Sequence, residues 1–175
     1  MDPTAYIRAM IRSLPPGGKA PRMSTLPSLA SRFEASSAAQ RRAVHFGLAQ
    51  HAASVWQQFI ESKPDLAYVE SVVGTRQTVD PTLPHDALRS ALRGEDLADV
   101  ERRYLEPIAA LQDSDLELPD NVTYAYYAIY NLFRKYAQGR DMEDWLIVNQ
   151  ALSSETDATR WVTLLEEALT GAERL

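Results

Sequence analysis

The chain of 175 residues carries a net charge of −6, with 45% hydrophobic and 24% charged residues and no cysteine. These proportions are typical of a globular protein and exclude a largely disordered chain. The lack of cysteine excludes disulfides, thiolate metal sites and cysteine nucleophiles. A chain of this length can bury about 70% of the surface that it exposes when unfolded, so we expect a single domain over residues 1–175 with one core.

The N-terminal segment, MDPTAYIRAMIRSLPPGG, has Arg8 and Arg12 inside its apolar run, which is unlike a secretion signal. No stretch approaches the roughly 20 apolar residues of a membrane-spanning helix. Arginine outnumbers lysine by 15 to 3, a usage that suggests a GC-rich bacterial genome. We therefore expect a bacterial, cytoplasmic protein with no membrane partner.

Charge is distributed unevenly along the chain. Residues 1–60 hold seven Lys or Arg against two Asp or Glu, whereas residues 61–175 hold eleven against twenty-two. An acidic surface repels phosphate backbones and attracts cations, so the larger part of the chain predicts a basic protein partner and no nucleic acid. The alternative interpretation is a solvated surface that only keeps the protein in solution.

The first third of the chain is expected to contain three helical segments. A first helix over residues 1–14 is joined to the rest by a Pro/Gly-rich loop at 15–27. The spacing of apolar residues predicts a short helical turn over 28–34 and a long core helix over 38–62. Ser36 or Ser37 is expected to cap the long helix.

The middle of the chain has weaker signals. A short helix is predicted over residues 66–73, followed by a loop over 75–84 and a brief helix over 85–93. A further helix is expected over 95–111, where Pro107 either kinks or splits it because proline removes a backbone hydrogen bond.

The last third contains three predicted helices. An acidic connection at 113–121 precedes a tyrosine-rich helix, capped by Asp120 or Asn121, and helices over 141–152 and 154–170 follow. No segment shows sustained alternation of period two. We therefore predict an all-α protein, an irregular bundle of about seven helices around a single core, with no sheet.

Five of the eight tyrosines lie within residues 124–137, YAYYAIYNLFRKYA. Tyr126, Ile129, Tyr130 and Phe133 recur at helical spacing and are expected to face the core. The remaining rings lie around the helix from that stripe, so the helix is either central or binds another protein. A platform for stacked bases would need interleaved basic residues, which this segment lacks.

No catalytic signature is present. His45 and His51 are six residues apart and cannot chelate one metal as an i, i+4 pair can, and His85 stands alone. The segment PPGGK lacks the glycine spacing and the Ser or Thr of a phosphate loop. We therefore predict that the protein is not an enzyme and has no catalytic residues, no metal site and no cofactor.

The segment YNLFRKYAQGRDMEDWLIVNQALSS, residues 130–154, resembles the cytosolic immunity proteins encoded beside bacterial polymorphic and contact-dependent toxins. The likeness is one of general character: an acidic, cysteine-free, helical protein in which a tryptophan-bearing amphipathic helix follows an aromatic central one. This resemblance implies a protein that binds and neutralises a cognate toxin by occluding its basic active site. The alternatives are a non-catalytic helical adaptor or scaffold in a larger assembly and a helical DNA-binding regulator.

Negative charge and phenol rings from the acidic part of the chain supply the expected contact surface, because aromatic anchors and complementary charge are common at interfaces. The protein is expected to be a monomer or a homodimer. The predicted partner-binding residues are Asp113, Asp115, Glu117, Asp120, Tyr124, Tyr127, Asp141, Glu143 and Asp144.

Overall fold

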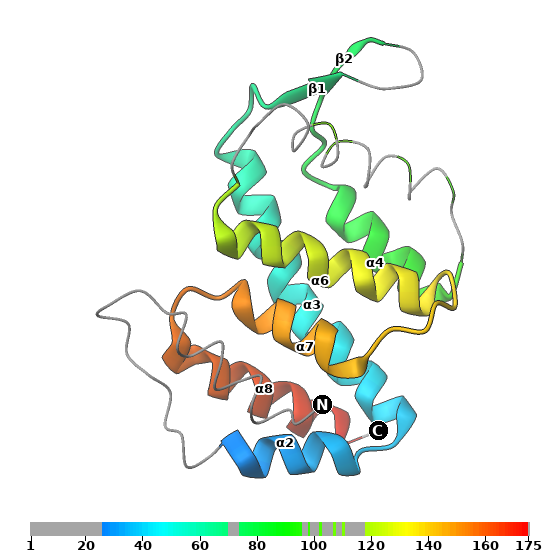
Figure 1. Ribbon diagram of the computed structural model, residues 1–175, viewed down its shortest axis with the longest axis vertical. Coiled ribbons are helices and arrows are strands. Elements are labelled where there is room, and N and C mark those ends of the chain that lie inside the picture. Colours follow the sequence, from blue (N-terminus) through cyan, green and yellow to red (C-terminus); the bar gives the residue numbers. More distant parts are fainter. Residues whose placement is uncertain are drawn as a thin grey trace.

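The computed structural model describes residues 26–69, 74–95 and 118–174, with the single positions 98, 102, 107 and 110. Six helices and one two-stranded sheet lie in this part of the chain (Figure 1). They are α2 (Leu26–Ala35), α3 (Ala38–Glu61), β1 (Ala67–Val69), β2 (Arg76–Thr78), α4 (Leu83–Arg93), α6 (Asp120–Tyr136), α7 (Asp144–Ser153) and α8 (Ala158–Ala172). The predicted first helix, and most of the predicted loop at 15–27 and helix at 95–111, lie outside the described residues.

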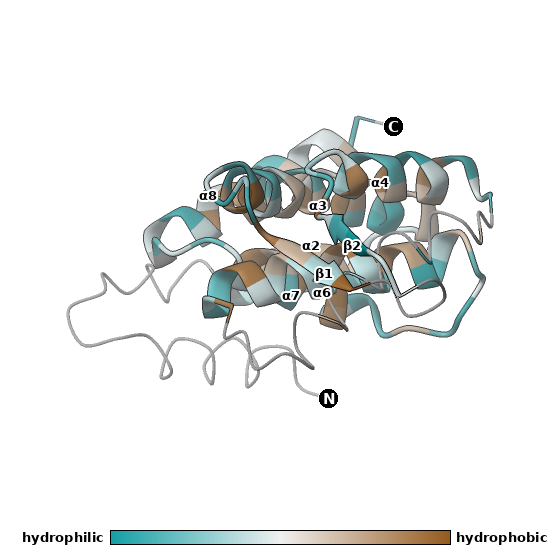
Figure 2. Cartoon of the chain, turned by 90° about the horizontal axis from the view of Figure 1, so that it is seen from above, coloured by the Kyte–Doolittle hydropathy of each residue, from teal (hydrophilic) through white to brown (hydrophobic). Residues whose placement is uncertain are grey.

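The long helix α3 is the centre of the fold. It packs against α4, α6, α7 and α8, and α6 and α7 lie on one side of the molecule with α4 and α8 on the other (Figure 2). The helix begins at a capping box, in which the Ser37 hydroxyl accepts from the Gln40 amide and the Gln40 side chain accepts from the Ser37 amide. This pairing satisfies two backbone donors that no helical carbonyl can reach, so the predicted start is confirmed.

The core is built on the inward sides of these helices. Val44, Leu48 and Trp56 of α3 are buried, as their spacing predicts, while Val55 and Phe59 are half-buried against the same cluster. The other large buried side chains come from α2, α6, α7 and α8: Phe33, Ile129, Leu132, Ile147, Leu152, Leu165 and Leu169. One hydrophobic cluster thus joins helices that are far apart in sequence.

Gly47 of α3 lies beside Ala168 of α8, where the two helices cross. A Cβ atom built on Gly47 would lie 3.7 Å from the Cβ of Ala168, which is ordinary van der Waals contact. The crossing therefore has room for a methyl group at position 47, and a longer side chain would overpack the crossing where it turns toward Ala168.

We expect Gly47→Ala to raise the free energy of unfolding by about 0.5–1 kcal/mol, because alanine loses less backbone entropy in a helix. Gly47→Leu should lower it by about 1–3 kcal/mol by overpacking the crossing. Urea denaturation measures both. The control is Gly171→Leu on α8, where a Cβ meets nothing within 4 Å. Equal effects of the two leucine variants would contradict this account of the crossing.

The hairpin corrects the prediction of a fold without a sheet. Ala67–Val69 pairs with Arg76–Thr78 in antiparallel register, so the helix predicted over 66–73 is wrong. The amide of Val79 donates to the carbonyl of Leu66 at 3.0 Å, and Val79 is buried where the hairpin joins the core. Strands of three residues are too short to show the alternation of apolar and polar residues by which a strand is predicted.

Several helix ends also differ from the predictions. The short turn expected at 28–34 is part of the ten-residue α2, which includes the last two residues of the predicted loop. Pro119 occupies the N-cap position of α6, where Asp120 or Asn121 was expected. Helix α7 begins at Asp144 rather than at Asp141. The amine of Lys135 donates to the carbonyl of Met142 at 2.6 Å and so holds the preceding link outside the helix.

The structure therefore shows a mostly helical protein, as predicted, with six helices in its described part rather than about seven and with a small sheet. In that part of the chain, no helix has both the length and the apolar character needed to cross a membrane.

Candidate functional site

Helix α6 buries one side of its tyrosine-rich sequence. Tyr126, Ile129 and Phe133 are buried, as their spacing predicts. The Tyr126 ring lies 5.7 Å from the Trp56 ring of α3, and burial raises the pKa of its phenol above the usual value. Tyr130 stacks on Tyr126 with a centroid separation of 6.0 Å but is only half-buried. The core therefore fixes the position of a ring that reaches the surface.

Three tyrosines spaced three residues apart reach the outside of α6. Tyr124 is 44% exposed, and Tyr127 and Tyr130 are half-buried; we call these three residues the tyrosine ridge. The guanidinium of Arg134 lies 5.2 Å from the centre of the Tyr130 ring. Side chains three apart are neighbours on a helix, so the ridge presents adjoining amphipathic rings on a rigid support.

The predicted acidic residues are divided between the two ends of α6. Asp120 is exposed in its first turn, whereas Asp141 and Glu143 are exposed in the link that follows its last turn (Figure 1). A helix of 17 residues is about 25 Å long, so the structure does not bring these two groups together. Asp113, Asp115 and Glu117 lie outside the described residues.

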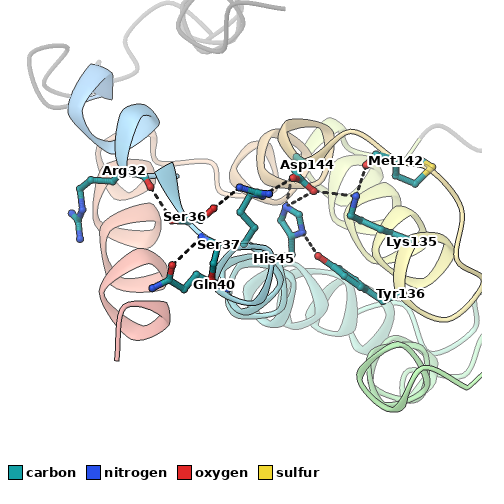
Figure 3. A network of polar contacts seen from close by, with 10 residues as sticks. Arg32, Ser36, Ser37, Gln40, His45, Lys135, Tyr136, Met142 and Asp144 are labelled. Atoms are coloured by element: carbon teal, nitrogen blue, oxygen red, sulfur yellow. Dashed lines mark hydrogen bonds and ion pairs between the residues drawn. The ribbon is translucent and has the colours of Figure 1, made fainter. Parts of the chain in front are cut away.

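Asp144 differs from the other predicted acidic residues because its charge is already paired inside the protein. One carboxylate oxygen, Oδ2, lies 2.9 Å from Nε of Arg41, and the other, Oδ1, lies 3.0 Å from Nζ of Lys135. Arg41 comes from α3, Lys135 from α6 and Asp144 from α7. Figure 3 shows Lys135 and Asp144 beside the ring of His45. Two cations beside one carboxylate leave little net negative charge there to attract a partner.

His45 occupies the inner side of this cluster and has no exposed surface. Its Nε2–H donates to the backbone carbonyl of Asp144 at 3.0 Å, and the Tyr136 hydroxyl donates to its Nδ1 at 2.8 Å. Burial lowers the pKa of His45 to about 4, opposed by the Asp144 carboxylate and assisted by the cations of Lys135 and Arg41. Burial also raises the pKa of Tyr136 to about 12. Both groups are therefore neutral near pH 7.

Acid should destabilise the fold through His45. The imidazole is protonated near pH 6.5 in the unfolded chain but only near pH 4 in the folded protein. The stability that this difference contributes is therefore fully present above pH 6.5 and is lost as the pH falls from 6.5 toward 4. Between pH 7 and 4.5 the loss attributable to His45 should be about 2–3 kcal/mol. Urea denaturation of wild type and His45→Gln across that range measures it.

The expected result is a shallower dependence of unfolding free energy on pH in His45→Gln than in wild type. The matched control is His85→Gln, which replaces an exposed histidine of α4. Identical slopes in wild type and His45→Gln would contradict the buried neutral state.

A polar pocket of about 590 Å³ lies where α3, the start of α6 and the connection from α7 to α8 meet. His51 and Phe59 of α3 line it together with Asn121 of α6, and Glu155 and Arg160 form the wall beside α8. This volume falls within the range of about 300–1,000 Å³ that is usual for ligand sites. The pocket therefore has the size of a binding site, and its lining includes charged groups.

Glu155 is the central group of this pocket. Its side chain is only 8% exposed, and its Oε1 accepts from the Asp157 amide at 2.9 Å. Its Oε2 lies 3.2 Å from Nη1 of Arg160 and 3.5 Å from Nε2 of His51. Burial lowers the pKa of His51, opposed by the Glu155 charge and assisted by that of Arg160. A largely desolvated carboxylate is thus held in one orientation beside a neutral imidazole.

Sequence reasoning missed this pocket. It considered His51 only as a candidate metal ligand and named neither Glu155 nor Arg160. The closest local signal is the segment SETD, which was expected to begin the last helix at Ser154 or Thr156. In the structure Asp157 caps α8 by accepting from the Thr159 amide at 2.9 Å. The turn between the end of α7 and Asp157 places the side chain of Glu155 in the pocket.

Comparisons of this chain with protein-family models, with curated proteins and with solved structures gave no match.

Proposed function

We propose that this protein is an immunity protein that binds a basic bacterial toxin in the cytoplasm and blocks its active site, with the tyrosine ridge at the centre of the contact. The observation that carries this proposal is the exposure of Tyr124 beside Tyr127 and Tyr130 on one helix of an acidic protein. The resemblance of residues 130–154 to immunity proteins supports the toxin as the partner.

The tyrosine ridge has properties that favour protein binding. Each ring offers a large amphipathic surface at the cost of only two side-chain torsions. The packing of Tyr130 on Tyr126, and of Tyr126 on Trp56, holds part of the ridge in place before a partner arrives. Less conformational entropy is then lost on association, which raises the affinity for a given contact area.

Charge would steer the partner to this face. Asp120 at one end of α6 and Asp141 with Glu143 at the other are exposed, and Asp113, Asp115 and Glu117 remain part of the proposed contact. Acidic groups at both ends of the tyrosine ridge speed the association of a basic protein and orient it. Asp144 is assigned a structural role, since Arg41 and Lys135 neutralise it.

The tyrosine ridge is tested with the product of the gene next to the one that encodes this chain. Co-expression should rescue growth from that toxin, and the two proteins should co-purify. The double variant Tyr124→Ala/Tyr127→Ala should weaken binding by roughly 30- to 1,000-fold, as expected for anchor residues. Isothermal titration calorimetry measures the change.

The control for this experiment is Leu92→Ala, which truncates an exposed apolar residue of α4. It should bind like wild type. A neighbouring product that neither inhibits growth nor co-purifies would overturn the toxin assignment, and normal binding by the double tyrosine variant would overturn the position of the contact.

The acidic flank gives a separate prediction. Asp141→Lys/Glu143→Lys should slow association and flatten its dependence on salt, because the steering charge is reversed. Stopped-flow measurements at low and high ionic strength report both quantities. Glu34→Lys/Glu166→Lys, which makes the same charge change on α2 and α8, is the control. Equal effects of the two double variants would show that net charge, rather than this flank, steers the partner.

A further inference from the structure

We propose that the polar pocket around Glu155 receives an arginine or lysine side chain of the partner. This inference rests on the proposed function in one respect, that the partner is basic. The affinity of the pocket for a basic side chain depends only on the pocket itself.

The two charges of the pocket, which are paired with each other, differ in burial. Glu155 is its one carboxylate and Arg160 its one permanent cation among the lining residues described. Arg160 is mostly exposed, with a side-chain exposure of 61%, so water can solvate it if it is displaced. Glu155 is buried and has already lost most of its hydration, so a second cation gains attraction without a new desolvation cost for the acid.

The resident ion pair shows that the carboxylate accepts a guanidinium. Nη1 of Arg160 reaches Oε2 of Glu155 at 3.2 Å, while the Asp157 amide holds Oε1. An incoming guanidinium or ammonium could take the place of Arg160 or share the same oxygen.

The remaining lining groups suit a long basic side chain. Val55, Phe59 and Val122 provide an apolar wall against which the methylene groups of lysine or arginine can pack. The Phe59 ring can also attract the cationic head. Asn121, Gln58 and Ser54 carry oxygen atoms that accept hydrogen bonds. An anion could pair with the exposed Arg160 but would also meet the Glu155 carboxylate, and a neutral ligand would not gain the electrostatic attraction.

The pocket can be tested without the partner. The intact protein is titrated with N-acetyl-arginine amide and with its neutral isostere N-acetyl-citrulline amide. Nuclear magnetic resonance follows the ring of His51 and the indole N–H of Trp161, which donates to the Glu155 carbonyl at 3.0 Å. The arginine probe should give saturable shifts at millimolar concentration, and the citrulline probe should bind at least about tenfold more weakly.

Two variants locate the binding on Glu155. Glu155→Gln should abolish the preference for arginine over citrulline, and Arg160→Ala should bind the arginine probe more tightly because a competing cation is gone. Glu166→Gln, which replaces an exposed glutamate of α8, is the control and should retain the preference. Equal binding of both probes to the wild-type protein, tighter binding of N-acetyl-aspartate amide, or no binding of any probe would each overturn the proposal, even if Glu155→Gln failed to fold.

The outcome separates this proposal from the toxin assignment. Arginine-specific binding together with failure of the neighbouring gene product to associate would leave the pocket proposal standing and overturn the proposed function. Toxin binding without any arginine-specific shift would leave the proposed function standing and overturn the pocket proposal.

Discussion

The carboxylate of Asp144 links three helices beside the buried ring of His45. It joins Arg41 near the start of α3 to Lys135 near the end of α6, and it lies in the first turn of α7. Either ion pair alone would be partly exposed and would contribute little to stability. Because both cations share one carboxylate beside a buried histidine, the two ion pairs form a network in which each restrains the geometry of the other. This network ties the last turn of α6 to the starts of α3 and α7, while the packing of Tyr126 on Trp56 fixes the side of α6 that faces the core.

The division of tyrosines on α6 illustrates how one helix can serve two purposes. Tyr126 packs against Trp56 and contributes to the core, whereas Tyr124 projects outward only two residues earlier. Tyr130 is intermediate in exposure: its ring stacks on Tyr126 and is half-buried. A surface built in this way is continuous with the core, so changes in packing beneath it alter the presentation of the rings above.

Local sequence signals predicted the parts of the fold that local physics determines. The serine cap and the spacing of Val44, Leu48 and Trp56 gave the long helix, and Tyr126, Ile129 and Phe133 gave the buried side of α6. The hairpin was missed because its pairing joins residues that no periodicity links. Glu155 was missed for the same reason: its neighbour His51 is more than a hundred residues away in sequence, and a glutamate in a polar turn looks like any solvated one.

The hairpin also marks where this chain can change in length. Its two strands have three residues each, and Leu66 and Val79 join it to the core at its base. Residues 74–78 are exposed, and a two-stranded ribbon of this size adds little stability of its own. A peptide tag or a whole domain inserted at Gly74 would therefore leave the helices in register, which makes this end of the molecule a natural point of fusion.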